Sequence, residues 1–255
     1  MINQDLLKNC PSRVDIIGVS ISAVNLNSCM EFLFNNWNIA HGNYICISNV
    51  HTTVMAHDNE EYLKVQSESL LSLPDGKPLS IIGKKRHSYM DRVTGPDLMR
   101  RVFDESKKKD IKHFFYGSTK ENIDALIKKI NNDYPWVNVV GSEPSVFREM
   151  SIEEEQDLVK RINGTKADFV WIALGAPRQE LFCHRNEGQI NSIMVGVGGA
   201  FSVLAGTIPE APEWMKKMSL EWLYRLIQEP KRLFKRYAIT NTKFVYYMII
   251  KRKKK

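Results

Sequence analysis

Cysteine is scarce in this chain of 255 residues, and the four that occur lie far apart, at Cys10, Cys29, Cys46 and Cys183. They form no C-x-x-C pair, which excludes a disulfide framework and indicates reduced thiols in a cytosolic protein. Long apolar runs are missing too. The roughly 18 consecutive apolar residues of a transmembrane helix occur nowhere, and the opening segment has no apolar stretch behind a basic one. Neither a membrane span nor a signal peptide is therefore expected.

Several short motifs that mark phosphate and metal sites are also absent. There is no G-x-x-x-x-G-K-[ST], which excludes a P-loop, and no complete G-x-G-x-x-G after the first strand, so a dinucleotide site is not expected. The sequence has no H-E-x-x-H, no Cys/His cluster and no Asp-x-Asp pair to hold a divalent ion against a diphosphate. We expect no metal and no cofactor. A bound diphosphate would have to be met by arginines, lysines and helix N-termini.

The overall composition, 43% hydrophobic and 25% charged residues, is that of an ordinary soluble globular protein. Apolar runs of strand length begin near residues 14, 44, 69, 111, 137, 167 and 192. Between them, helices are predicted over 24–40, 95–109, 119–133, 151–164 and 177–188. Thr119, Ser151 with Glu154, and Pro177 are helix start signals. The alternation predicts a Rossmann-like, largely parallel sheet flanked by helices.

The net charge of +7 is distributed unevenly. Residues 211–255 hold 13 Lys and Arg against 3 Asp and Glu, a net +10, which leaves 23 against 26 for residues 1–210. From Trp214 the pattern is helical without strands, and Pro230 breaks it into three predicted short helices. We expect a core, 1–210, and a basic helical appendage, 211–255, whose partner is nucleic acid, a phosphorylated ligand or an anionic membrane surface.

The appendage ends in the apolar run FVYYMII, flanked by Lys243 and KRKKK. Seven residues cannot span a bilayer. The run can lie in a membrane interface, or it can pack on the core as a helix with a solvated lysine end.

Ligands of parallel sheets bind beyond the carboxyl ends of the strands, so the loops that follow the strands are the candidate site. These loops contain Gly117, Gly175, Gly196, Gly198 and Gly199. Asp75 also follows a strand directly and could accept a proton from a substrate hydroxyl, although P-D-G is a common turn sequence as well. In the appendage, Arg225, Arg232 and Arg236 recur at helical spacing. These arginines either bind a diphosphate or form a basic helix face that is exposed to solvent.

Several motifs occur in a fixed order: LPDGKPL at 73–79, RVTGPDL at 92–98, FFYGS at 114–118, ALGAPRQE at 173–180, GVGGAFSVLAG at 196–206, APEWM at 211–215 and LEWLYRLIQEPKRLFKRY at 220–237. With them the sequence resembles the WecG/TagA/CpsF glycosyltransferase family from about residue 14 to 237. That family transfers N-acetylmannosamine, its uronic acid or another hexose from a UDP-sugar to an undecaprenyl-diphosphate-linked sugar.

The resemblance implies that Asp75 is the catalytic base, that Asn49, Arg92 and Gln179 line the sugar and acceptor pocket, and that the loop Gly196–Phe201 borders the nucleotide. It also implies a metal-independent, inverting reaction, completed by appendage arginines at the inner face of the bacterial plasma membrane. Assembly into a homo-oligomer is left open.

The sequence departs from the family pattern at three positions near the donor site. Ile47 stands where Thr is common, Ser202 where Asp is common, and Glu210 where Arg is common. Because buried polar partners discriminate between substrates, these changes leave open whether the donor is UDP-N-acetylmannosamine, its uronic acid or another sugar such as UDP-glucose.

Two other functions compete with the transferase. A basic, aromatic tail could bind nucleic acid, but the core is net negative and carries no nucleic-acid motif, so no nucleic-acid partner is expected. The three departures would suit an inactive scaffold for polysaccharide assembly. Retention of the four implied pocket residues argues against that alternative.

Overall fold

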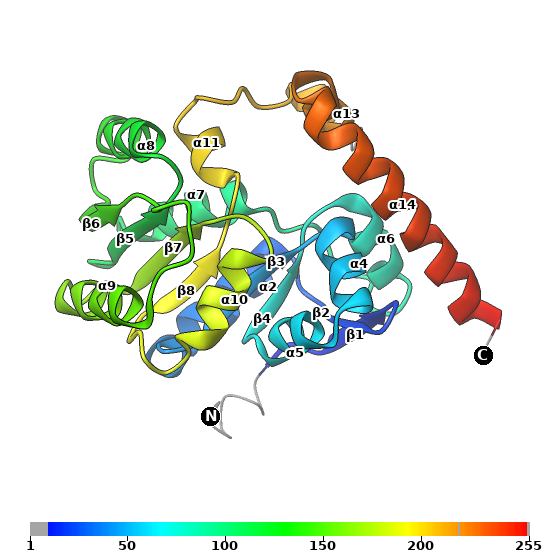
Figure 1. Cartoon of the computed structure of the whole chain (residues 1–255), viewed down its shortest axis with the longest axis horizontal. Coiled ribbons are helices and arrows are strands. Elements are labelled where there is room, and N and C mark those ends of the chain that lie inside the picture. The colour runs from blue at the N-terminus through cyan, green and yellow to red at the C-terminus, as the bar shows by residue number, and fades with distance from the viewer. Residues whose placement is uncertain (1–9, 219, 254–255) are drawn as a thin grey trace.

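The computed structural model of the chain describes residues 10–218 and 220–253, without the side chains of residues 217, 232 and 251–253. Six strands form its central sheet: β3 (Tyr44–Ser48), β4 (Leu71–Pro74), β5 (Lys112–Gly117), β6 (Asn138–Glu143), β7 (Phe169–Ala173) and β8 (Ile193–Gly196). Their order is β4-β3-β8-β7-β5-β6, and every neighbouring pair is parallel (Figure 1). The predicted α/β fold with a parallel sheet is confirmed.

Helices cover both faces of the sheet: α2 (Leu26–Asn35), α3 (Trp37–Ala40), α4 (Val50–Asp58), α5 (Glu60–Glu68), α6 (Lys77–Lys84), α7 (Gly95–Glu105), α8 (Lys120–Asp133), α9 (Ile152–Gly164), α10 (Arg178–Arg185) and α11 (Ala200–Leu204). The predicted helix start signals lie at the first turns of helices. The Thr119 side chain caps α8, and Ser151 and Glu154 form a capping box on α9. Pro177 immediately precedes α10.

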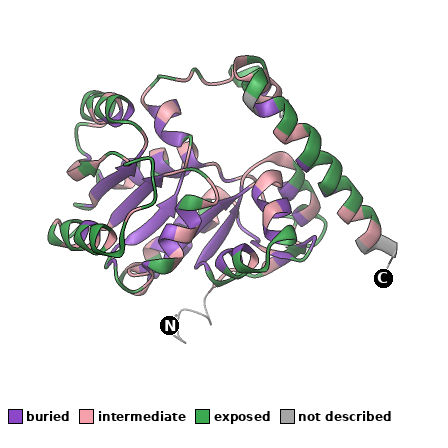
Figure 2. Cartoon of the chain, viewed as in Figure 1, coloured by how far each residue is buried: buried purple, intermediate pink, exposed green. Residues whose placement is uncertain are grey.

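The sheet is buried on both faces, which explains why its strands are continuous apolar runs. In β7, Phe169 and Trp171 belong to one hydrophobic cluster, whereas Val170 and Ile172 belong to the cluster on the other face. Figure 2 shows β3, β4, β5, β7 and β8 as the buried centre of the molecule, whereas the edge strand β6 is only partly buried. The strand ends, rather than the strand interiors, are therefore available to a ligand.

The first apolar run forms a hairpin and not the single strand that its pattern predicts. β1 (Arg13–Ile16) pairs antiparallel with β2 (Val19–Ser22), outside the main sheet. The chain reverses at Ile17 and Gly18, whose φ angles of 50° and 89° match a tight two-residue turn. The glycine makes this reversal sterically accessible.

No helix is predicted between residues 50 and 68, yet α4 and α5 occupy that segment. α4 is hard to recognise because polar Thr52 and Thr53 are buried along with Val54, so apolar and polar residues do not separate onto two faces. Tertiary packing, and not an amphipathic pattern, determines this helix.

Three helices follow the last strand: α12 (Glu213–Lys217), α13 (Glu221–Gln228) and α14 (Pro230–Lys253). The predicted break at Pro230 is confirmed, because this residue begins α14. α14 is 24 residues long and not short as predicted. It packs against α4, where Lys243 Nζ lies 2.6 Å from Asp58 and the Tyr247 hydroxyl donates to Asp58 at 2.6 Å (Figure 1).

The apolar C-terminal run lies in α14, which packs on the core, one of the two arrangements expected for it. Leu233 and Phe244 are buried against the core. The outer surface is exposed (Figure 2) and carries apolar side chains at Phe234, Ile239, Val245, Tyr246 and Ile249. Across the described residues, no helix has the length and apolar character needed to cross a bilayer.

Candidate active site

The loops with the predicted site residues follow five neighbouring strands. Because the strands are parallel, their carboxyl ends meet at one edge of the sheet. β4 leads to Asp75, β3 to Asn49, β8 to Gly196–Gly199, β7 to Gly175 and β5 to Gly117. Residues far apart in the sequence thus share one edge, as the loop pattern predicts.

Asp75 lies at the junction of β4 and α6 and is partly buried. Its N–H donates to the Ser48 carbonyl at 2.7 Å, which ties it to the end of β3. Gly76 follows with a φ of 94°, a conformation that favours glycine and turns the chain into α6. The P-D-G sequence is therefore both a turn and the means of placing a carboxylate at the rim of the sheet.

Four charged side chains act on the Asp75 carboxyl: Arg92, Arg225, Asp97 and Glu221. Burial raises the pKa of Asp75 most strongly, and the two acidic neighbours add to this. The two arginines oppose it, and the resulting pKa is about 6. Such a carboxylate is ionised at neutral pH yet basic enough to accept a proton in catalysis.

Arg92 connects the core to the appendage. Its guanidinium makes a bidentate ion pair with Glu221 of α13, in which Nη2 donates to Oε1 at 3.0 Å. The adjacent Val93 N–H donates to the Pro74 carbonyl at 2.8 Å, which fixes the Arg92 loop beside β4. Burial lowers the pKa of Arg92, but Glu221 more than offsets this and stabilises the charged form.

Arg225 is the appendage arginine that lies at Asp75. It is on α13, four residues after Glu221, so the two side chains share one helix face. A Cβ atom at Gly199 would lie 3.8 Å from Arg225 Nη1. The bare glycine backbone and the guanidinium therefore border one another beside the carboxylate, in the kind of arrangement that accommodates a phosphate.

The other two predicted arginines lie on α14. The Arg232 side chain is outside the described part of the structure. Arg236 is half-buried near His51, whose pKa is lowered by burial and by the Arg236 charge. Both His51 Nδ1 and Arg236 Nε are buried without a hydrogen-bond partner among the described residues. Arg236 therefore lies at the start of α4.

Asn49 is the N-cap of α4. Its Oδ1 accepts hydrogen bonds from the N–H groups of His51 and Thr52 at 3.0 and 3.2 Å. Just before it on β3, Ile47 is buried, and its Cδ1 would lie 3.5 Å from a Cβ at Gly95. Ile47 therefore makes an apolar core contact at the position where the resemblance implies a hydroxyl.

Gln179 is buried and uses its amide within the protein. Its Oε1 accepts from the Gly175 N–H at 3.0 Å, and its Nε2 donates to Glu180 at 2.8 Å. Cβ atoms at Gly196 and Gly198 would lie 3.2 and 3.3 Å from this side chain. Gln179 thus holds the loops after β7 and β8 together.

Gly117 and Phe201 contribute to the packing beneath the carboxyl edge of the sheet. Gly117 has a φ of 112°, and a Cβ there would lie 2.6 Å from the Ala173 carbonyl oxygen, so only glycine permits this approach of β5 and β7. The Phe201 ring is fully buried, with its centroid 5.8 Å from that of Phe115. Only the backbone of Phe201 is left to border a ligand.

The remaining departures have different surroundings. Ser202 lies in α11, and its carbonyl accepts the N–H groups of Thr207 and Ile208. Glu210 forms ion pairs with Arg100 of α7 and with Lys216, the latter at 2.6 Å. The reversed charge at 210 therefore joins the start of the appendage to the core.

Two charged residues that act on Asp75, Glu221 and Asp97, were not predicted as site residues. Glu221 had a sequence signal, since it precedes Arg225 by one helical turn within LEWLYRLIQEP. His51 follows Asn49 at the predicted rim of the sheet, but a lone histidine is more often structural than catalytic, so it was not predicted as a site residue.

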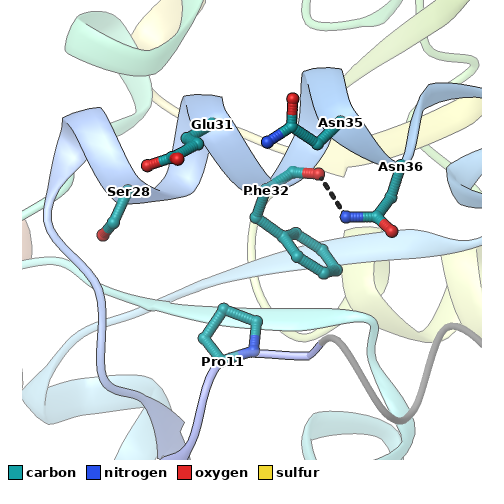
Figure 3. A pocket seen from close by; sticks show the side chains of 6 residues that line it. All are labelled: Pro11, Ser28, Glu31, Phe32, Asn35 and Asn36. Carbon is teal, nitrogen blue, oxygen red and sulfur yellow. Dashed lines mark hydrogen bonds between the residues drawn. The ribbon is translucent and has the colours of Figure 1, made fainter.

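The described part of the structure also has two surface pockets. Figure 3 shows the first, about 460 Å³, lined by Pro11 and five residues of α2 and its end, where Asn36 donates to the Phe32 carbonyl. Glu31 is the charged residue among these six, so this pocket offers no cation to a diphosphate. The second, about 880 Å³, lies between α9, α10 and the loop before α9, and two of its arginines pair with glutamates of α9. Neither pocket has a predicted site residue among its described lining.

The chain is similar in sequence to known proteins. The model of the "Glycosyl transferase WecG/TagA/CpsF family" matches residues 14–255. The N-acetylglucosaminyldiphosphoundecaprenol N-acetyl-beta-D-mannosaminyltransferase of Bacillus subtilis (strain 168) is 30% identical over 224 residues, 85% of this chain and 86% of the relative. The protein of the same name from Bacillus spizizenii (strain ATCC 23059 / NRRL B-14472 / W23) is 31% identical over 196 residues, 75% of this chain and 73% of the relative.

Proposed function

Because this chain belongs to the WecG/TagA/CpsF family of glycosyl transferases, we propose that it transfers N-acetylmannosamine from a UDP-sugar to N-acetylglucosaminyl-diphosphoundecaprenol. The names of both relatives support this donor sugar and this acceptor. One observation of the chain itself carries the proposal: a carboxylate with a pKa of about 6, Asp75, lies beside Arg92 of the core and Arg225 of the appendage. Such a transfer needs a base that deprotonates the acceptor hydroxyl and, close to it, cations that stabilise the leaving diphosphate.

In the proposed reaction, Asp75 accepts the proton of an acceptor hydroxyl as that oxygen attacks the anomeric carbon of the donor. The family resemblance suggests the 4-hydroxyl of N-acetylglucosamine. A direct displacement of this kind inverts the anomeric configuration. The bond from the anomeric carbon to the UDP oxygen breaks as the new glycosidic bond forms, and the electron pair leaves with UDP.

Arg225, with Arg232 and Arg236, is proposed to stabilise the departing diphosphate, in the role that a metal ion has in other transferases. The position of Arg225 against Gly199 supports this, because the glycine-rich loop after β8 can approach a phosphate closely. Asn49, Gln179 and the loops at Gly117 and Gly175 are proposed to shape the donor pocket.

We also propose that residues 211–255 form an appendage to a core of residues 1–210 and bring the site to the inner face of the plasma membrane. The lipid-linked acceptor of the relatives supports this location. So do the net +10 of this segment and the exposed apolar side chains of α14.

The pH dependence of transfer should follow Asp75. A base must be ionised to act, so kcat/KM for donor should rise with pH through about 6 and level off above it. Initial rates measured between pH 5 and pH 8 with a soluble acceptor analogue would show this rise in kcat/KM. A rate that does not change across that range would contradict the assignment of Asp75 as the base.

Membrane binding should depend on the outer face of α14. Phe234, Val245 and Ile249 are exposed and recur at helical spacing, so a combined Phe234→Ser, Val245→Ser, Ile249→Ser variant loses apolar contact without loss of charge. Sedimentation with vesicles of anionic lipid should show binding weaker by about tenfold or more. Salt should weaken binding of the unaltered protein, because charges are screened over about 10 Å at 0.1 M.

Ile152→Ser on α9 is the matched control, since Ile152 is 74% exposed but far from the appendage. The control should bind vesicles as the unaltered protein does. Equal binding by the triple variant would overturn the proposed membrane face.

A screen of UDP-sugars with a synthetic N-acetylglucosaminyl-diphospholipid tests the proposed donor. UDP release should be fastest with UDP-N-acetylmannosamine. Faster release with UDP-glucose or the uronic acid would assign the substrate differently, and the apolar side chain of Ile47 at the strand end would then be a first place to look for the cause.

A further inference from the structure

Glu180 is a buried carboxyl group that the proposed reaction does not use. It lies in the first turn of α10, only 1% exposed. Its Oε1 accepts the hydrogen bond from Gln179 Nε2 at 2.8 Å, and its Oε2 has no hydrogen-bond partner among the described residues. Burying a carboxyl group this completely is costly, which suggests that Glu180 has a function.

The role of Glu180 depends on the contacts of the Gln179 side chain. The Gln179 amide can lie in two orientations related by a flip that exchanges oxygen and nitrogen. In the observed orientation its oxygen accepts from the Gly175 N–H. In the other, an NH₂ group would face that N–H, and the oxygen would face the Glu180 carboxyl group. The Gly175 N–H and the accepting oxygen of Glu180 therefore favour the same orientation of the amide, the one that joins the loop after β7 to the loop at Gly196–Gly198.

The same carboxyl group borders a buried polar cluster under the neighbouring strand ends. Tyr62 is adjacent to Glu180, and its hydroxyl accepts from Gln66 Nε2 at 3.0 Å. Gln66 Oε1 in turn accepts from the hydroxyl groups of Ser48 and Ser72 at 2.6 and 3.2 Å. Ser48 is the residue whose carbonyl receives the Asp75 N–H. Polar groups thus lie beneath the ends of β3, β4, β7 and β8.

We infer that Glu180 is a positioning residue, which acts through the Gln179 amide to hold the two glycine loops in the conformation that receives the donor diphosphate. This assignment deepens the proposed function and rests on it for the identity of the ligand. Its structural part, the effect of Glu180 on the loops, stands without any ligand.

The substitutions that test this proposal are chosen from the protonation and hydrogen bonding of Glu180. Burial raises the pKa of Glu180 to about 7, so the neutral acid is well populated near neutrality, and glutamine imitates that form. Glu180→Gln keeps an acceptor for Gln179 Nε2. Glu180→Met keeps the length of the side chain and removes the acceptor. Cys183→Ala, on the same helix and also fully buried, is the control for a general loss of packing.

Hydrogen exchange followed by mass spectrometry measures how well the backbone amides of the two loops are protected, in peptides that cover residues 174–179 and 196–201. Glu180→Met should raise exchange there by about tenfold, as expected when one buried hydrogen bond is lost, while Glu180→Gln and Cys183→Ala stay within about twofold of the unaltered protein. Calorimetry should show a UDP dissociation constant about tenfold higher for Glu180→Met alone.

Loop exchange in Glu180→Met equal to that of the unaltered protein would overturn the assignment, and so would a Glu180→Gln variant as impaired as Glu180→Met. If Glu180→Met does not fold, Gln179→Met, which removes the hydrogen bonds to both Gly175 and Glu180, must raise exchange in the same two loops, and unaltered exchange there would overturn the assignment. Failure of the unaltered protein to bind UDP would instead contradict the proposed function, while the exchange results would still decide the role of Glu180.

Discussion

Asp75→Asn should lower the turnover of the transferase by about 100-fold or more, the usual effect of losing a general base. Asparagine keeps the shape of the side chain, and the Asp75 N–H bond to Ser48 belongs to the backbone, so the turn into α6 should persist. UDP binding should remain. Steady-state rates with a soluble acceptor, together with calorimetry of UDP, measure the two effects separately.

The same substitution should stabilise the folded protein at pH 7. Folding raises the pKa of Asp75 from 3.8 to about 6, so the group favours the folded state below pH 4, and this contribution is lost as pH rises to about 6. Removing this partly buried charge should then raise the free energy of unfolding at neutral pH. A variant that melts at a higher temperature but transfers no sugar cannot be explained by misfolding. Unaltered turnover in Asp75→Asn would refute its role as the base.

Arg225→Ala should give the second large loss, about 100-fold to 1000-fold in turnover of a water-soluble acceptor. The physical reason is its location beside Asp75 and Gly199, where charge develops on the departing diphosphate. Lys235→Ala is the matched control, because it removes the same charge from an exposed position on α14. Both variants should bind anionic vesicles about equally.

The pH profile adds a readout that a purely structural role would not produce. Arg225 lowers the pKa of Asp75, so in Arg225→Ala the acid limb of the rate should move to higher pH. Equal turnover in Arg225→Ala and Lys235→Ala would show that the appendage does not complete the site.

Sequence patterns were sufficient for the framework of this fold because its strands are buried on both faces. A run such as Phe169–Ala173 is apolar throughout, and chain order then places the following loops at one edge of a parallel sheet. Asp75 could be located in the same way. The hairpin at Ile17–Gly18 and the helix α4 could not, since turn geometry and burial of threonine override periodicity there.

Contacts within the site were harder to predict than its members. The ion pair of Arg92 with Glu221 joins residues 129 positions apart, and only the packing of α13 on the core brings them together. Motifs identified Gln179 and Phe201 but not the direction of their side chains. In the structure one holds two loops together and the other is buried in the core.

The stereochemistry of the product tests the central claim most directly. UDP-N-acetylmannosamine and a synthetic N-acetylglucosaminyl-diphospholipid are incubated with the unaltered protein, and NMR determines the anomeric configuration of the disaccharide formed. The proposed single displacement, with Asp75 as the base, predicts a β-linked N-acetylmannosamine from the α-linked donor. An α-linked product, or no disaccharide from this pair of substrates, would contradict it.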